Sequence, residues 1–196
     1  MNNDIEVIQK DGLNEMIAHA FRLGTGDAGP MLYDPDGTVQ HSGIILEMVG
    51  IEGHIHTGHA RGTCGYMNRA CLDQNPSAVT AACLAAGNDI FLKVSGLDEI
   101  DLPVACDGID FYLRLLEIGC RNPWTLFLEL CHHESATRGD HGTPEKIKRF
   151  PLEVSYMQER WSNLLEFDPV HHPISTLDAV GSGLALASPT GKPWQH

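Results

Sequence analysis

The sequence predicts an α/β fold, because short strand-like segments alternate with helix-like segments along its 196 residues. A strong turn signal, Asp34-Pro35-Asp36-Gly37, separates two strand-like segments and predicts a hairpin. Later in the chain, Pro144 opens a long amphipathic segment and predicts a helix that begins at this proline. A chain of this length builds one good core, or at most two very small domains.

The first elements are a strand, a helix, a hairpin and a further strand. Residues 4–8 are β-branched and apolar, which is typical of a strand. Asp11 can cap a helix, and Gly24 and Gly26 end it. The hairpin joins residues 31–33 to residues 38–41, and residues 43–49 continue as a strand. The apolar face expected for the helix consists of Leu13, Met16, Ile17, Ala20 and Phe21.

The second part begins with residues 50–76, whose glycines and lack of period predict a long, mobile loop. We expect a buried strand over residues 77–86, a helix over residues 108–118 that Gly119 closes, and a strand over residues 124–130. Residues 1–168 then form one domain portion, and residues 169–196 form an extended tail. The final helix, from Thr143-Pro144, should turn Val154, Met157, Trp161, Leu164 and Leu165 inward.

The charge balance excludes several classes of partner. Thirteen basic and 26 acidic residues give a formal net charge of −13. A field of this sign repels phosphate backbones and anionic lipid, so we expect no nucleic-acid partner. No apolar run approaches the roughly 20 residues that span a bilayer. The polar, acidic start lacks the pattern of a secretion signal. We therefore expect a cytoplasmic protein, with peripheral contact at the inner face of the membrane as an alternative.

The six cysteines lie at positions 64, 71, 83, 106, 120 and 131, without a CxxC pair. Thiols scattered in this way fit a reducing compartment better than a disulfide framework. We therefore expect free thiols.

Two groups of carboxylates are candidates for chemistry. Asp4 lies with other polar residues at the end of the first strand, where carboxylate oxygens suit Mg²⁺ or Mn²⁺. Asp107 and Asp110 lie at the start of the helix over residues 108–118, and one of them would act as a general base. The alternatives are a solvated terminus for Asp4 and plain helix capping for Asp107 and Asp110.

Two groups of histidines complete the candidates. His132 and His133 follow a strand in a loop that also carries Arg138, which suggests a metal or phosphate site. His54, His56 and His59 form an HxHxxH run. We interpret it as part of a polar loop that covers a pocket and not as a zinc centre, because no nearby aspartate completes a set of zinc ligands.

Together, these segments resemble the second half of family 2 glycosyltransferases, the inverting enzymes with a nucleotide-sugar (GT-A) fold. The resemblance runs from Met1 to about Pro173. Residues 2–8 look like the strand with the DxD-type metal motif, and residues 107–115 look like the segment whose first aspartate is the catalytic base. The other matching segments are residues 33–43 (the hairpin), 74–83 (the strand beside the sugar site), 96–99 (the turn after it) and 132–139 (the loop that closes the metal site).

The resemblance implies a partial GT-A, Rossmann-like fold, with a mixed sheet and flanking helices. It implies that Asp107 takes a proton from an acceptor hydroxyl, which attacks the sugar with inversion. Asp4, with His132 or His133, would hold a divalent cation, Mn²⁺ or Mg²⁺, against the leaving nucleoside diphosphate. The resemblance also implies a nucleotide-sugar donor, a saccharide or lipid-linked acceptor, and a role in bacterial cell-surface polysaccharide synthesis. By the same resemblance, we expect donor or acceptor contacts at Asn3, Thr80, Asp110 and Arg138.

The sequence also departs from this family. Cys106 lies where relatives commonly carry a polar or acidic residue beside the base, and the chain begins at the metal motif, without the units that hold the donor's base and ribose. Two alternatives therefore stay open. One is an inactive remnant or split half that folds with a partner chain or as a homo-oligomer, and the other is a histidine-rich metal-binding protein.

Overall fold

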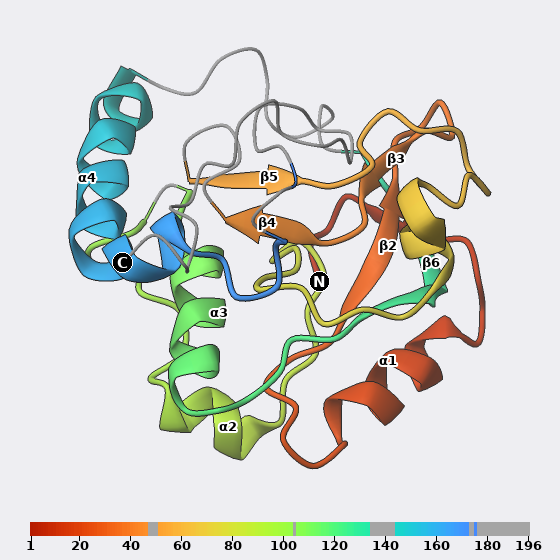
Figure 1. Cartoon of the computed structure of the whole chain (residues 1–196), viewed down its shortest axis with the longest axis horizontal. Helices are drawn as coiled ribbons and strands as arrows, with labels where there is room; N and C mark the ends of the chain where they lie inside the picture. Colours follow the sequence, from red (N-terminus) through yellow and green to blue (C-terminus); the bar gives the residue numbers. More distant parts are fainter. Residues whose placement is uncertain (47–50, 104, 134–143, 173–174, 176–196) are drawn as a thin grey trace, which may run out of the picture.

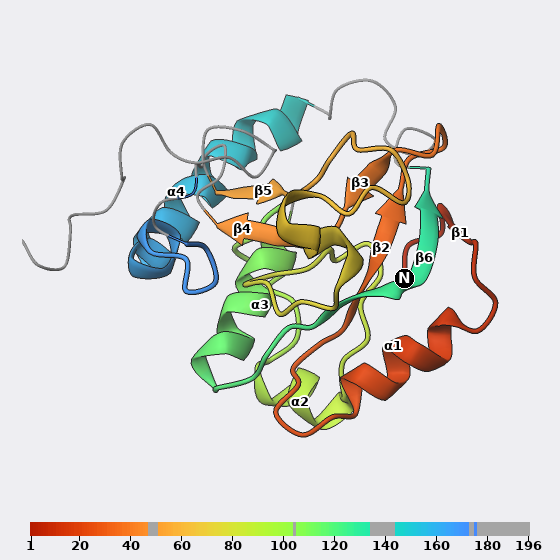
Figure 2. The same ribbon diagram turned by 45° about the vertical axis from the view of Figure 1, so that its right-hand side comes forward.

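The computed structural model describes residues 1–46, 51–103, 105–133, 144–172 and 175, and for residues 144–148 it describes the backbone alone. The fold is α/β, with a mixed sheet and flanking helices, and it is compatible with a Rossmann-like arrangement. Figures 1 and 2 show α4 at the side of the molecule opposite to α1. The expected tail falls almost entirely outside the described residues. No helix in the described part of the chain is long and apolar enough to cross a bilayer.

The main sheet joins four strands in the order β1-β6-β2-β3. β6 (Trp124–His132) lies between β1 (Ile5–Val7), which is antiparallel to it, and β2 (Gly29–Tyr33), which is parallel. β3 (Val39–His41) returns antiparallel to β2 through the predicted turn, whose Gly37 has φ 85°. The hairpin prediction is confirmed.

A second, two-stranded sheet pairs β4 (Ile44–Leu46) with β5 (Glu52–His54). β5 lies inside the segment for which the sequence predicts a long loop, and so does a 3₁₀ helix, Tyr66–Cys71. Cys64 and Cys71 form a disulfide. The loop prediction and the expectation of free thiols are therefore wrong here, because backbone pairing and a covalent link order this segment.

The segment over residues 77–86 is buried at residues 77–80, 82 and 83, but Ala81 is exposed, and the segment is not a strand. Ala78 and Ala85 each make a single β-bridge, to Ile44 and Ala28. Between them the chain turns at Ala81 and Ala82. The turn interrupts the ladder that the apolar composition suggested.

Two helices pack as the sequence predicts. α3 (Asp107–Glu117) ends before Gly119, whose φ is 79°, and α4 (Pro144–Glu166) buries Met157, Trp161 and Leu165. A short helix, α2 (Asn88–Lys93), was not predicted. These helices and one face of the sheet enclose the larger core.

Helix α1 (Gly12–Ala20) forms as predicted, but it faces the sheet with a different side. Gly12, Met16 and Ala20 are buried, whereas Leu13, Ile17 and Phe21 are 56%, 41% and 79% exposed. A Cβ on Gly12 would lie 2.4 Å from Leu128 Cδ1, so only a glycine permits this close approach to β6. The helix therefore docks along the line of Gly12, Met16 and Ala20, with the glycine at the closest approach.

Candidate functional site

A cavity of about 420 Å³ opens where β3, β5, the residue 79–82 turn, the start of α3 and the end of β6 meet. Residues far apart in the sequence contribute to its wall, and most polar ones were singled out above. The lining residues are Asn2, Gln40, Ile44, Glu52, His54, Val79, Thr80, Ala81, Ala82, Leu97, Ala105, Asp107, Gly108, Ile109 and His132.

Asp107 reaches this cavity because it is the first residue of α3. Glu153 of α4, which is 1% exposed, accepts hydrogen bonds from the backbone N–H groups of Ala105 and Cys106 at 3.0 and 3.4 Å. A Cβ on Gly108 would lie 2.7 Å from the Cβ of Ala81, so the helix start is pressed against the residue 79–82 turn. Both contacts fix the position of Asp107.

A second carboxyl group, Glu52 of β5, lines the same cavity. Burial and the charge of Asp107 raise the pKa of Glu52 to about 7. A carboxyl group whose pKa is raised beside a second carboxyl group is a common arrangement for acid and base roles. Glu52 is therefore partly protonated at neutral pH, beside the candidate base.

His41 and His54 form a hydrogen-bonded pair at the cavity. The Nε2 atom of His41 accepts hydrogen bonds from the N–H groups of Gly43 and Thr80 at 3.3 and 3.2 Å, so the ring hydrogen lies on Nδ1. That Nδ1 atom lies 3.3 Å from Nδ1 of His54, which then accepts. Burial and His54 lower the pKa of His41 well below its usual range. The neutral His41 thus orients His54, which lines the cavity.

Asp4 and His132 meet at the end of β6, where Oδ1 of Asp4 lies 3.3 Å from Nε2 of His132. The side-chain amide of Gln40 determines which ring nitrogen of His132 carries the hydrogen. Its nitrogen donates to Asp34 and to the carbonyl of His132, so its oxygen, 2.7 Å from Nδ1 of His132, accepts a hydrogen bond from that atom. In a neutral ring, Nε2 then presents a lone pair toward the carboxylate of Asp4. Two acceptors at this distance attract a cation or a proton between them.

The remaining predicted residues lie in different surroundings. Thr80 lines the cavity, whereas Asn3 is exposed and does not belong to the described lining. Asp110 is fully buried and accepts hydrogen bonds from Trp161 and Arg114 at 2.9 and 2.7 Å, outside this lining. His133 turns away from His132 and lies 3.1 Å from Glu6. Arg138 falls outside the described residues.

Comparisons with known proteins give two relatives, and no protein-family model matches the chain. The uncharacterized protein y4gI of Sinorhizobium fredii is 45% identical over 189 residues, which cover 96% of this chain and 21% of that protein. The O-antigen biosynthesis protein RfbC of Myxococcus xanthus is 32% identical over 188 residues, which cover 94% of this chain and 14% of that protein. The chain thus spans about a fifth or less of the length of these relatives.

Sequence reasoning missed Gln40, Glu52 and Glu153, and it assigned His54 to a loop. Glu52 and His54 alternate with Gly53 in a short strand that the surrounding glycines disguised. His56 and His59 do not line the cavity, and His56 is 1% exposed and bonded to Ser42. The alternation of polar Glu52 and His54 with Ile51, Gly53 and Ile55 was a signal of a strand within this segment.

Proposed function

We propose that this chain is part of a family 2 glycosyltransferase that transfers a sugar, with inversion, from a nucleotide-sugar donor to a saccharide or lipid-linked acceptor. The proposed setting is bacterial cell-surface polysaccharide synthesis, in the cytoplasm or at the inner face of the membrane. The name of the Myxococcus xanthus relative, an O-antigen biosynthesis protein, supports this setting.

One observation carries the proposal. Thr80, Asp107 and His132 come from three separate segments, and all three line one cavity. The sequence resemblance assigns each of these segments to the sugar or metal site of the family. If these residues only capped a helix or lay at the surface, there would be no reason for all three to line the same cavity.

Asp107 is the proposed general base, because it lies at a cavity wall and its position is fixed from two sides. It would take the proton of the acceptor hydroxyl as the oxygen attacks the anomeric carbon. The raised pKa of Glu52 reduces the negative charge that this second carboxyl group places beside Asp107 near neutral pH. Glu52 thus supplies an acidic group beside Asp107, where the sequence itself places Cys106.

Asp4 and His132 are the proposed ligands of a divalent cation, Mn²⁺ or Mg²⁺. The donor set fits, because a carboxylate suits both ions, an imidazole suits Mn²⁺, and a 3.3 Å separation agrees with bonds of about 2.0–2.4 Å to a shared ion. When bound, the cation would neutralise charge on the leaving diphosphate. Gln40 holds the His132 ring in the tautomer that binds a metal through Nε2.

The other proposed contacts have weaker support. Asn3 and Arg138 are proposed as donor or acceptor contacts from the sequence resemblance alone, as is His133 as an alternative cation ligand. The buried contacts of Asp110 with Arg114 and Trp161 favour a role in holding α3 against α4 over direct contact with a donor. Thr80 lines the cavity and has its backbone N–H bonded to His41.

Calorimetry with a panel of nucleotide sugars tests the proposal, on the chain and on the full gene product. One donor should bind with Mn²⁺ and lose affinity without it. Asp4→Asn should weaken this binding, and the exposed Asp36→Asn should leave it unchanged as a matched control. Transfer by the full product is then assayed with the donor that binds.

The outcomes separate the three candidates. Donor binding without transfer by the full product would favour an inactive remnant. Tight stoichiometric zinc at Asp4 and His132, with no donor bound, would favour a histidine-rich metal-binding protein and overturn the glycosyltransferase assignment.

A further inference from the structure

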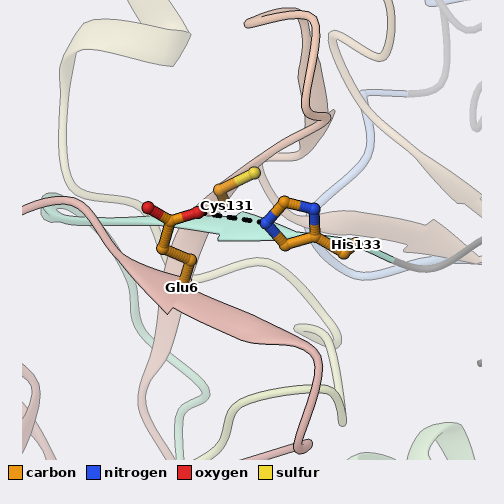
Figure 3. Close-up of side chains that lie close together, drawn as sticks. All are labelled: Glu6, Cys131 and His133. Atoms are coloured by element: carbon orange, nitrogen blue, oxygen red, sulfur yellow. Dashed lines mark hydrogen bonds and ion pairs between the residues drawn. The ribbon is translucent and has the colours of Figure 1, made fainter. Parts of the chain in front are cut away.

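Three ligand-type side chains lie together on the face of β6 opposite to His132. Glu6 of β1 is paired directly with Cys131 of β6, and His133 follows Cys131 by two residues. Figure 3 shows the three side chains converging, Glu6 from one chain segment and Cys131 and His133 from the other. One ligand atom from each lies within 4.8 Å of the other two.

The register of the β1–β6 ladder creates this cluster. In an antiparallel pair, opposite residues place their side chains on the same face, about 4.5–5.5 Å apart at Cβ, and the diagonal neighbour remains in reach of a long side chain. His133 already spans this diagonal, because its Nε2 atom lies 3.1 Å from Oε2 of Glu6. Cys131 is not part of the disulfide. Its thiol therefore remains available as a third ligand.

The donor set selects a particular class of metal. A thiolate, an imidazole and a carboxylate together suit a borderline-soft divalent ion, and hard ions such as Mg²⁺ avoid a thiolate ligand. Three protein ligands leave one of the four tetrahedral positions of zinc for water or another small ligand. The exposure of Glu6 and His133, whose side chains are 70% and 39% exposed, gives an ion access from solvent.

We propose that Glu6, Cys131 and His133 bind a zinc ion on the outer face of the β1–β6 ladder. The thiol of Cys131 loses its proton to solvent when the ion binds. The ion links the short edge strand β1 to β6, since its ligands come from both strands. This site is separate from the Asp4–His132 pair, which lies on the other side of β6, and it does not depend on the proposed transferase activity.

Equilibrium dialysis with Zn²⁺, followed by metal analysis, measures the stoichiometry. The chain should retain one equivalent that Cys131→Ser and Glu6→Gln each lose. Cys120→Ser is the matched control, because Cys120 is also a partly exposed free cysteine but lies outside the cluster. Glu6 is exposed, so Glu6→Gln should leave the circular dichroism spectrum unchanged.

Cobalt substitution identifies the ligands. Co²⁺ should give a thiolate-to-metal charge-transfer band that disappears in Cys131→Ser and persists in both Cys120→Ser and Asp4→Asn. Zn²⁺ should also protect Cys131, but not Cys120, from alkylation, as mass spectrometry would show. A cobalt spectrum without a thiolate band, or a zinc stoichiometry that Cys131→Ser leaves unchanged, would overturn the proposal.

Discussion

Glu52 and Asp107 interact across the cavity: burial raises the pKa of the Glu52 carboxyl group, and the charge of Asp107 raises it further. Glu52 reaches the site from β5 and Asp107 from the start of α3. Through this charge interaction, a residue of the two-stranded sheet acts directly on the candidate base.

The Glu52–Asp107 coupling predicts a titration shift. The pKa of Glu52 should be about 7 in the parent chain and should fall in Asp107→Asn, which removes one of its two causes. Carbon-13 NMR of labelled glutamate across pH 4 to 9 measures it. Glu52→Gln assigns the signal. An unchanged Glu52 pKa in Asp107→Asn would show that the two groups do not interact.

Asp107→Asn should keep the fold and donor binding, yet transfer by the full gene product should fall by about 10²–10⁴-fold, the usual contribution of a general base. Helix capping predicts no change, because asparagine caps a helix as well as aspartate does. Steady-state kinetics with the donor that binds in calorimetry distinguishes the two. Turnover at the parental rate would remove Asp107 from the mechanism.

Asp27→Asn should stabilise the protein at neutral pH. Asp27 is fully buried, and burial raises its pKa well above the usual range. A raised pKa in the folded state means that stability is lost as pH rises above the unfolded value of about 3.9. Urea unfolding should therefore show a gain at pH 7 that shrinks toward pH 4.

The exposed Asp36 provides a control for this experiment, because its substitution by asparagine should change the stability at neutral pH in the opposite direction. Hydrogen bonds from the side chain and the backbone N–H of Thr38 lower its pKa. Asp36→Asn should therefore lose stability at pH 7 and approach the parent at low pH. Equal effects of the two substitutions at every pH would contradict the assigned role of burial.

Acid should destabilise the fold through His56. The Nδ1 atom of His56 lies 2.9 Å from the Ser42 hydroxyl, which itself donates to the Ile55 carbonyl, so Nδ1 carries the hydrogen. Burial lowers the pKa of His56 to about 4. Stability should fall as pH drops from 6.5 to 4, since the unfolded chain takes up the proton first.

Substitution of His56 measures how much this histidine contributes to the change of unfolding free energy with pH. A single titrating group changes the free energy of unfolding by at most about 1.4 kcal/mol per pH unit. His56→Asn suits the positive φ of 62° at this position and should reduce the slope by up to this amount in urea unfolding. An identical slope in the variant would exclude His56 as the source.

The exposed side of α1 should cause self-association of the isolated chain. Leu13, Ile17 and Phe21 lie on one exposed stripe, and contiguous apolar surface favours association. Leu13→Glu with Phe21→Glu should reduce the mass measured by light scattering without changing circular dichroism. Ile100→Glu is the matched control, because Ile100 is 82% exposed elsewhere. A monodisperse monomer in the parent chain would contradict this prediction.

The sequence predicted elements with a clear period or a strong turn signal. The hairpin followed from the Asp34–Gly37 turn, and the inward face of α4 followed from the spacing of Met157, Trp161 and Leu165. The face of α1 was not predictable in this way. Two adjacent lines of the helix are apolar or small, and periodicity cannot tell which one a close approach at Gly12 selects.

The candidate site was predictable where a residue belonged to a recognisable segment. Asp107, Thr80 and His132 were named from such segments, and they line one cavity. Glu52 and Gln40 depend on which distant residues they meet, Asp107 in one case and His132 in the other. Tertiary partners of this kind leave no local pattern in one sequence.

The alternation of side chains along β6 limits which insertions and deletions the chain tolerates. His132 borders the cavity, and its neighbour His133 lies in the cluster on the opposite face. Because side chains alternate with a period of two, losing or gaining one residue within β6 would exchange the two histidines between the faces. Homologues should therefore vary in loop length on either side of this strand, while the number of residues from Trp124 to His133 stays constant.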